Sequence, residues 1–261
     1  MKLIVDAGAT KAQWALSGGK RFLTEGLNFA HMPEEKLRLV LSEAAEKSGP
    51  GVTEVHFFAA GLVGESPVRL EEFFPGADVE YASDMVGAAR ALFGRGRGVA
   101  AIIGTGANTC LWDGTGIRRQ FRSGGYVIGD EGSAAALGRL FLSDYVKGLV
   151  PEALASAFGA SYADIVREIY ASPSPARYLG SIAPFLLERY ADPYVKSLID
   201  NNFRAFFERT VCRYGPSSLG VVGGFGFAAR EILRSVGREC GIELETVMPS
   251  PMEGLLRYYG I

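Results

Sequence analysis

Four residues near the start of the chain carry groups that bind phosphate and metal ions. They are Asp6, Gly8, Thr10 and Lys11. An apolar run over 3–5 precedes them and predicts a strand buried on both faces, and a short second strand is expected over 13–16, so the four residues would lie at the tip of a hairpin. Bare backbone beside a hydroxyl, an ammonium and a carboxylate suits phosphate plus a metal ion. An ordinary hairpin at the start of an α/β domain gives the same pattern, so this interpretation needs support from elsewhere in the chain.

That support comes from a second copy of the pattern. A buried strand is expected over 99–103, a turn of small residues over 104–108 and a returning strand over 109–112. A glycine-rich segment, 94–98, separates the two copies. The repetition indicates a duplicated domain. Two glycine turns at matching places, each facing a cleft, would clamp one polyphosphate.

Acidic residues supply a second kind of candidate. Asp84 follows a short expected strand over 79–82 and precedes an apolar helix, so it could act only as a helix N-cap. It also lies at the carboxyl end of a strand, where α/β sheets place ligands, and therefore close to Asp6. Asp130 and Glu131 are framed by glycines before another helix. Capping would explain these two acids as well, but the density of glycine favours a ligand role.

The expected elements that position these residues form two domains. The first has further strands over 20–27 and 52–60 and helices over 34–47, 66–74 and 85–93. The second has a helical stretch over 131–214, strands over 219–222 and 242–247, and helices over 228–237 and 251–259. Strands and helices in this order predict mixed sheets with helices on their faces. The predicted class is α/β, with domains over 1–97 and 98–261 and a helical insertion at about 131–214.

Composition excludes several classes of protein. Hydrophobic residues make up 48% and charged residues 21%, which is typical of a globular protein. The net charge is −2, so no basic field attracts nucleic acid or an anionic membrane, and neither partner is expected. Three scattered cysteines predict neither a disulfide framework nor a CxxC metal site, and they favour a reducing cytoplasm. We expect no signal peptide and no membrane span.

A late glycine turn offers a competing site. The sequence has no GxxxxGK[ST] element, so it is not a P-loop protein. The stretch 224–229 fits the loose dinucleotide pattern GxGxxA between a strand and a helix, with Glu243 and Glu245 roughly 20 residues further on. This alternative would make the chain a dinucleotide-binding oxidoreductase. It leaves the two earlier glycine turns without a role.

Five segments occur in the order found in sugar kinases of the actin, hexokinase and Hsp70 superfamily. They are Asp6-Ala-Gly-Ala-Thr10-Lys11, Ser83-Asp84, Gly104-Thr-Gly-Ala-Asn108, Gly129-Asp-Glu-Gly132 and Val222-Gly-Gly224. Over nearly its whole length the chain resembles the N-acetylglucosamine kinase group and its relatives, the BadF/BadG/BcrA/BcrD ATPase-type proteins. The resemblance implies two ribonuclease-H-like domains with mixed five-stranded sheets, closing on ATP in a cleft. It also implies Mg²⁺ as a cofactor.

The resemblance assigns roles to individual residues. Asp6 would hold Mg²⁺, and the phosphates of ATP would be bordered by Gly8, Thr10, Lys11, Thr105, Gly106 and Asn108. Gly223 and Gly224 would lie beside the adenosine. Asp84 matches the acid that accepts the proton of the attacking sugar hydroxyl, and Asn28 and Asp130 match positions that hold the sugar. Phosphoryl transfer depends mainly on such positioning and on charge neutralisation.

The chain departs from the family pattern at several positions. Ala107 stands where Ser is usual, Ala7 and Ala9 replace residues that are often Gly or Ser, and Gly124 stands where several amino-sugar kinases have an aromatic residue. The expected function is still ATP-dependent phosphorylation of a small sugar, N-acetylglucosamine or a related amino sugar. The expected partners are this sugar and, in a homodimer, a second copy of the chain. The alternatives are a nucleotide-binding regulator of the same fold without sugar transfer and the oxidoreductase above.

Overall fold

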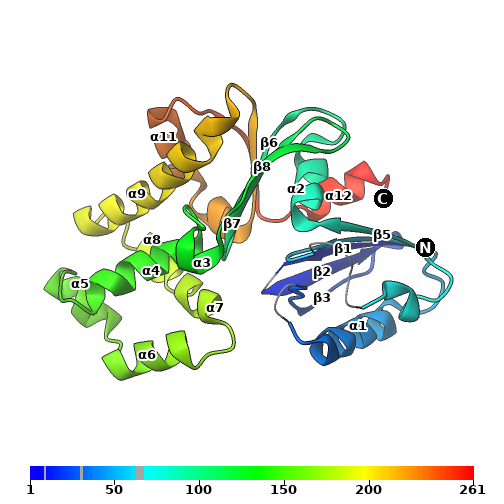
Figure 1. Cartoon of the computed structure of the whole chain (residues 1–261), viewed down its shortest axis with the longest axis horizontal. Coiled ribbons are helices and arrows are strands. Elements are labelled where there is room, and N and C mark those ends of the chain that lie inside the picture. The colour runs from blue at the N-terminus through cyan, green and yellow to red at the C-terminus, as the bar shows by residue number, and fades with distance from the viewer. Residues whose placement is uncertain (9, 30–31, 63–67) are drawn as a thin grey trace. The chain divides into compact units, whose positions relative to one another are not determined.

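The computed structural model describes residues 1–8, 10–29, 32–62 and 68–261 and divides the chain into two compact units (Figure 1). The first unit comprises 1–96, 113–117 and 250–261, and the second comprises 97–112 and 118–249. The first division, at 96/97, lies next to the domain boundary expected at 97/98. The predicted second domain runs to 261, but the sequence left open which domain the helix expected over 251–259 packs on. In the structure the last twelve residues, 250–261, belong to the first unit.

The sheet of the first unit has the order β3-β2-β1-β4-β5. Its strands are β1 (Lys2–Ala7), β2 (Lys11–Leu16), β3 (Arg21–Glu25), β4 (Glu54–Ala59) and β5 (Asp78–Ser83). The pairs β1–β2 and β2–β3 are antiparallel, whereas β1–β4 and β4–β5 are parallel. The carboxyl ends of β1, β4 and β5 therefore meet at one edge of the sheet.

Helices cover both faces of this sheet (Figure 1). They are α1 (Glu34–Ser48), α2 (Asp84–Phe93) and α12 (Met252–Tyr258), with a short 3-10 helix over Leu70–Glu72. The 3-10 helix replaces the helix expected over 66–74, of which 66 and 67 lie outside the described residues. Leu3, Ile4 and Val5 are fully buried, as a strand covered on both faces requires. Leu3 and Val5 share one core with the apolar side of α1.

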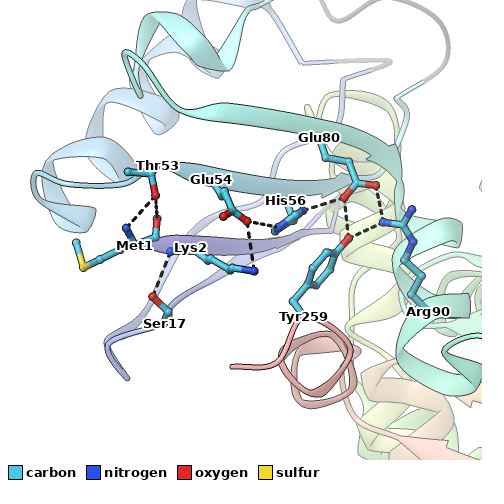
Figure 2. Close-up of polar contacts among 9 residues, drawn as sticks. All are labelled: Met1, Lys2, Ser17, Thr53, Glu54, His56, Glu80, Arg90 and Tyr259. Atoms are coloured by element: carbon cyan, nitrogen blue, oxygen red, sulfur yellow. Dashed lines mark hydrogen bonds and ion pairs between the residues drawn. The ribbon is translucent and has the colours of Figure 1, made fainter.

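Helix α12 is fixed to the first unit by close packing and by polar contacts (Figure 2). Gly254 leaves no room for a Cβ against the backbone oxygen of Ala91 on α2. The Tyr259 hydroxyl donates to Glu80 Oε2 at 2.7 Å and accepts from Arg90 at 2.5 Å. The Tyr259 ring stacks on His56 with 3.8 Å between the ring centroids. The end of the chain is thus an integral part of the first unit.

The sheet of the second unit repeats the strand order of the first, reading β8-β7-β6-β9-β10 from its other end. Its strands are β6 (Gly98–Ile103), β7 (Ala107–Trp112), β8 (Ile117–Phe121), β9 (Leu219–Val222) and β10 (Leu244–Met248). β6 pairs antiparallel with β7 and parallel with β9, and β9 pairs parallel with β10. The duplicated plan and the two five-stranded mixed sheets are confirmed.

Between β8 and β9 the chain is helical. The helices are α3 (Gly125–Ile128), α4 (Ala134–Tyr145), α5 (Glu152–Phe158), α6 (Tyr162–Tyr170), α7 (Pro175–Gly180), α8 (Ala183–Leu187) and α9 (Pro193–Arg209), followed by a 3-10 helix over Val211–Tyr214; α10 (Gly224–Ala228) and α11 (Arg230–Glu239) come after β9. Phe203, Phe206 and Phe207 of α9 are buried in the core of this unit, so these aromatic side chains serve packing. Within the described part of the chain, no helix has the length and apolar character needed to span a bilayer.

Candidate active site

Two carboxylates lie at the carboxyl edge of the first sheet. Asp6 is the penultimate residue of β1, and Asp84 follows directly on the end of β5, which pairs with β4 beside β1. Ser83 is the N-cap of α2 and accepts the Val86 N–H at 3.4 Å, so capping does not require Asp84. The Asp84 carboxylate accepts the N–H of Met85 at 2.8 Å. The structure therefore brings Asp6 and Asp84 together, as the sequence predicted.

The protein environment disfavours the charged forms of both acids. The pKa of Asp6 is raised to about 7, first by burial and second by the nearby charge of Asp84. Lys11 and a hydrogen bond with Ser250 lower this pKa in part. The pKa of Asp84 is raised to about 6 by burial, against the lowering effect of the Met85 N–H. Raised pKa values of two neighbouring acids are typical of functional sites.

The turn between β1 and β2 is tied to the loop that carries Asn28. The Gly8 N–H donates to the Lys11 carbonyl at 3.1 Å, and the Gly8 carbonyl accepts from Leu27 at 3.0 Å. The Thr10 carbonyl accepts from Gly26 at 3.2 Å. Lys11 is exposed at the start of β2. These main-chain bonds fix the turn, and the ammonium group of Lys11 lies close enough to Asp6 to lower its pKa.

Asn28 reaches the same edge of the sheet. It forms an isolated parallel bridge with Ala60, which directly follows β4, and the Phe29 N–H donates to the Ala60 carbonyl at 3.1 Å. The Ala60 N–H in turn donates to Ala7 of β1 at 2.9 Å. Asn28 is therefore linked through backbone to the strand that carries Asp6.

The acid pair fits Mg²⁺ better than a metal that needs a full set of protein ligands. Among the described residues, no group of three or more His, Cys, Asp or Glu side chains could hold a metal ion. Mg²⁺ keeps several waters and binds through one or two carboxylates together with substrate phosphates. Two half-buried acids that repel each other, Asp6 and Asp84, provide the negative charge that such an ion neutralises.

The matching turn of the second unit is fixed against helix α4. The Gly104 N–H donates to the Gly106 carbonyl at 2.9 Å. The carbonyls of Gly104 and Thr105 accept from Ala134 and Ala135 at 3.0 Å each, at the start of α4. These bonds hold the β6–β7 turn in one conformation.

Asp130 lies against this turn. It is 8% exposed and has a φ of +56°, a left-handed conformation that is uncommon outside glycine. A Cβ at Gly106 would lie 2.9 Å from its Oδ2, and its carboxylate accepts hydrogen bonds from Ala107 and Ser123. Burial raises the pKa of Asp130. The carboxylate that the resemblance assigned to sugar binding thus contacts the turn assigned to phosphate.

Asn108, Gly223 and Gly224 are the other residues predicted to line the site in the second unit, and they differ in what surrounds them. The Asn108 side-chain oxygen accepts from Thr109 at 2.9 Å and from Gln120 at 3.2 Å, so it is used within the sheet. Gly223 has a φ of +126° and leaves no room for a Cβ against the Ile103 carbonyl, whereas a Cβ at Gly224 would meet open space. Both glycines follow β9 at the carboxyl edge of the second sheet.

Packing explains the glycine of the competing dinucleotide pattern. A Cβ at Gly226 would lie 3.0 Å from Cβ of Ile103 and 3.2 Å from the Val221 side chain. Helix α10, which this turn opens, has only five residues. Gly226 is therefore required for contact with the sheet, and the pattern needs no pyrophosphate to account for it.

The substitution at Gly124 has a backbone reason. Gly124 has a φ of +79°, which favours glycine, and a Cβ there would lie 3.2 Å from the Ile128 side chain. An aromatic residue at this position would be strained in the observed conformation.

Two supporting residues were missed by the sequence reasoning. Asn202 is 2% exposed; its Oδ1 accepts from Gly132 at 3.0 Å and its Nδ2 donates to the Ser133 carbonyl at 3.1 Å. It thus fixes the segment that follows Asp130. A polar residue on the apolar face of α9 was the available signal. The second residue is Ser250, whose hydrogen bond with Asp6 joins segments far apart in the sequence.

Comparisons with known proteins agree with this architecture. No family model and no curated protein matches the chain. A crystal structure from Porphyromonas gingivalis, described as a candidate N-acetylglucosamine kinase, is 38% identical with a TM-score of 0.94, covering 99% of this chain and 98% of that one. One from Chromobacterium violaceum, with the same description, is 19% identical with a TM-score of 0.71, covering 98% of each chain. A ROK-family transcriptional regulator, homologous to the E. coli MLC protein, is 15% identical with a TM-score of 0.59, covering 99% of this chain and 79% of that one.

The last two similarities concern the fold alone, whereas the first extends at substantial identity over nearly the whole of both chains. It agrees with the resemblance found in the five sequence segments and with the two actin-like sheets. The chain belongs to the N-acetylglucosamine kinase-like family of the actin, hexokinase and Hsp70 superfamily.

Proposed function

We propose that this protein is an ATP-dependent carbohydrate kinase that phosphorylates a hydroxyl of N-acetylglucosamine or a related amino sugar. The observation that carries the proposal is the pair of half-buried acids, Asp6 and Asp84, on one edge of the first sheet. The full-length similarity to a candidate N-acetylglucosamine kinase supports the substrate class.

Asp84 is proposed as the group that accepts the proton of the sugar hydroxyl. An efficient general base has a pKa near the working pH, and burial places the pKa of Asp84 at about 6. At neutral pH the carboxylate is then ionised, yet it is a stronger base than an exposed aspartate. A hydroxyl held at hydrogen-bond distance from it would be oriented for attack on the γ-phosphate.

Asp6 is proposed as the residue that holds Mg²⁺. The ion would neutralise negative charge on the phosphates and permit Asp6 and Asp84 to be ionised together. The ammonium of Lys11 would bind phosphate oxygens, and Gly8 and Thr10 would border them. The Gly8 N–H is already bonded to the Lys11 carbonyl, so Gly8 would act by letting the phosphates approach the turn closely. The second unit would contribute the main chain of Thr105 and Gly106 to ATP binding, and Gly223 and Gly224 would lie beside the adenosine.

Sugar binding is assigned to Asn28 and Asp130. Asn28 is bonded through backbone to the end of β4, and its amide can both donate to and accept from sugar hydroxyls. Asp130 already accepts two hydrogen bonds from its own unit, so we propose that it holds the sugar with its remaining acceptor capacity. Asn108 is proposed to act through the shape of its turn, because its side-chain oxygen is already engaged.

The test is ADP release measured against a panel of sugars and amino sugars, with a sugar-free control. The proposal predicts that N-acetylglucosamine or a close relative stimulates release well above the control. ATP binding with no stimulation by any sugar would contradict it and would favour a regulator of the same fold. NAD or FAD binding that is abolished by Gly226→Val would support the oxidoreductase instead.

A further inference from the structure

The chain re-enters the first unit at Ser250, directly after leaving the second at Pro249. Ser250 Oγ lies 2.9 Å from the side-chain oxygen of Gln13 on β2. Ser250 Oγ also accepts the Met252 N–H at 3.2 Å. The first residue of the returning segment is therefore bonded to the strand beside the one that carries Asp6.

Gln13 and Asp6 face each other across the β1–β2 pair. The strands are antiparallel, and the register places Asp6 opposite Gln13. Directly opposed residues in such a pair project from the same face of the sheet. The Ser250 hydroxyl thus reaches the face from which the Asp6 carboxylate projects, and the two groups share a hydrogen bond.

We infer that Ser250 is a positioning residue for the Asp6 carboxylate, donating its single hydroxyl proton to Asp6 while Met252 and Gln13 donate to its oxygen. A serine hydroxyl has one proton and two acceptor positions, so this arrangement uses all three. The Gln13 amide presents either its oxygen or its NH₂ group to Ser250 after half a turn. An ionised carboxylate, which is the form that would hold a metal ion, is a stronger acceptor than an amide oxygen, so in that form of Asp6 the proton goes to Asp6.

Helix α12 keeps Ser250 in place. Glu253 forms an ion pair with Arg21, the first residue of β3. Further along, Tyr259 is bonded to Glu80 and Arg90 (Figure 2). The end of the chain thus fixes the hydroxyl through its own contacts with β3, β5 and α2. Such support is what a carboxylate needs if it is to hold a metal ion in one orientation.

The inference rests on the proposed function in one respect, which is that Asp6 holds Mg²⁺. Ser250→Ala removes the donor to Asp6 and the acceptor for Met252, whereas Ser250→Thr retains the hydroxyl. Loss of a residue that supports a metal ligand typically costs 10- to 100-fold in metal affinity or activity. We expect Ser250→Ala to raise the Mg²⁺ concentration needed for half-maximal rate by about tenfold or more, and Ser250→Thr to restore most of the loss.

The matched control is Ser17→Ala. Ser17 accepts the backbone N–H of Lys2 at 3.1 Å at the opposite end of the same strand pair (Figure 2). Ser17→Ala removes a comparable hydroxyl group that lies far from Asp6 along β1. This variant should leave the Mg²⁺ dependence unchanged.

A second measurement does not depend on turnover. In the protein without nucleotide, the ¹³C resonance of the Asp6 side-chain carboxyl should shift in Ser250→Ala, stay in place in Ser17→Ala and return toward the wild-type position in Ser250→Thr. An Asp6 resonance that is the same in Ser250→Ala and wild type would overturn the inference. If the wild type phosphorylates no sugar, the proposed function fails, but the carboxyl resonance still decides the role of Ser250.

Discussion

The two units have the same strand order but place different groups at the carboxyl edge of the sheet. The first unit has Asp6 and Asp84, two half-buried acids whose pKa values are raised to about 7 and about 6. The second unit has a turn at Gly106 that is held by the start of α4 and touches Asp130. A duplicated topology therefore provides two equivalent positions, of which one carries two neighbouring carboxylates with raised pKa values and the other a length of backbone fixed by hydrogen bonds.

This comparison predicts that substitutions in the two units affect different kinetic constants. The largest effect is expected for Asp84→Asn, which removes the proposed base without changing the size of the side chain. The kcat for sugar phosphorylation should fall by about 10²- to 10⁴-fold, while the KM for ATP and the melting temperature stay close to wild type. Steady-state kinetics would measure kcat and the KM for ATP, and a thermal melt would measure the melting temperature. A melting temperature that falls together with kcat would argue for a structural role of Asp84.

The corresponding change in the second unit is Gly106→Ala. The added methyl group would lie 2.9 Å from the Asp130 carboxylate, so the turn or Asp130 must move. We expect the KM for ATP to rise by about tenfold, the effect of losing about 1.4 kcal/mol of binding, with a smaller change in kcat. Gly104→Ala is the control, because a Cβ at Gly104 meets no atom within 4 Å. Equal effects of the two substitutions would mean that contact with Asp130 does not set the turn.

A third prediction concerns the support behind Asp130. Asn202→Ala leaves the Gly132 N–H and the Ser133 carbonyl without their buried partner. We expect a loss of about 1–3 kcal/mol in the free energy of unfolding. Asn201→Ala, at the exposed neighbouring position on α9, should cost less than about 0.5 kcal/mol. Denaturant unfolding of both variants would test the difference, and similar losses would show that the buried amide is not needed.

The smallest effect is expected at the attachment of α12 in the first unit. Hydrogen bonds, first of all from His56, lower the pKa of Glu80 from 4.5 to about 2. Because the folded pKa lies below the unfolded value, the stabilisation is fully present above pH 4.5 and is lost as the pH falls toward 2. Partial exposure of Glu80 limits the contribution to about 1 kcal/mol.

Glu80→Gln should therefore lower the free energy of unfolding at pH 7 by about 1 kcal/mol. It should also flatten the dependence of this free energy on pH between 4.5 and 2. Glu46→Gln, on the exposed side of α1, should leave both unchanged. Urea unfolding at several pH values would show the contrast. An unchanged slope in Glu80→Gln would mean that Glu80 does not link folding to pH.

Local pattern was sufficient for much of the fold. The apolar runs before Asp6 and before Gly104 predicted the central strands of both sheets, because a strand buried on both faces must be apolar throughout. Helical patterns predicted α1 and α2 and the helical character of the chain over 131–214. The rule that ligands lie at the carboxyl ends of parallel strands predicted that Asp84 lies near Asp6.

Long-range contacts could not be predicted in the same way. The return of 250–261 to the first unit depends on packing between Gly254 and α2, which no local pattern encodes. The contact of Asp130 with Gly106 depends on a positive φ at a residue that is not glycine. The contacts of Ser250 could not be predicted either, because its neighbours on β1 and β2 lie more than two hundred residues earlier in the chain.

The central claim is that Asp84 acts in the chemical step. A single-turnover measurement with labelled ATP and N-acetylglucosamine, or the best sugar from the panel, follows that step without product release. We predict that Asp84→Asn binds ATP as tightly as the wild type but forms phosphorylated sugar at least about 100-fold more slowly. Phosphorylated sugar formed at the wild-type rate by Asp84→Asn would contradict the account.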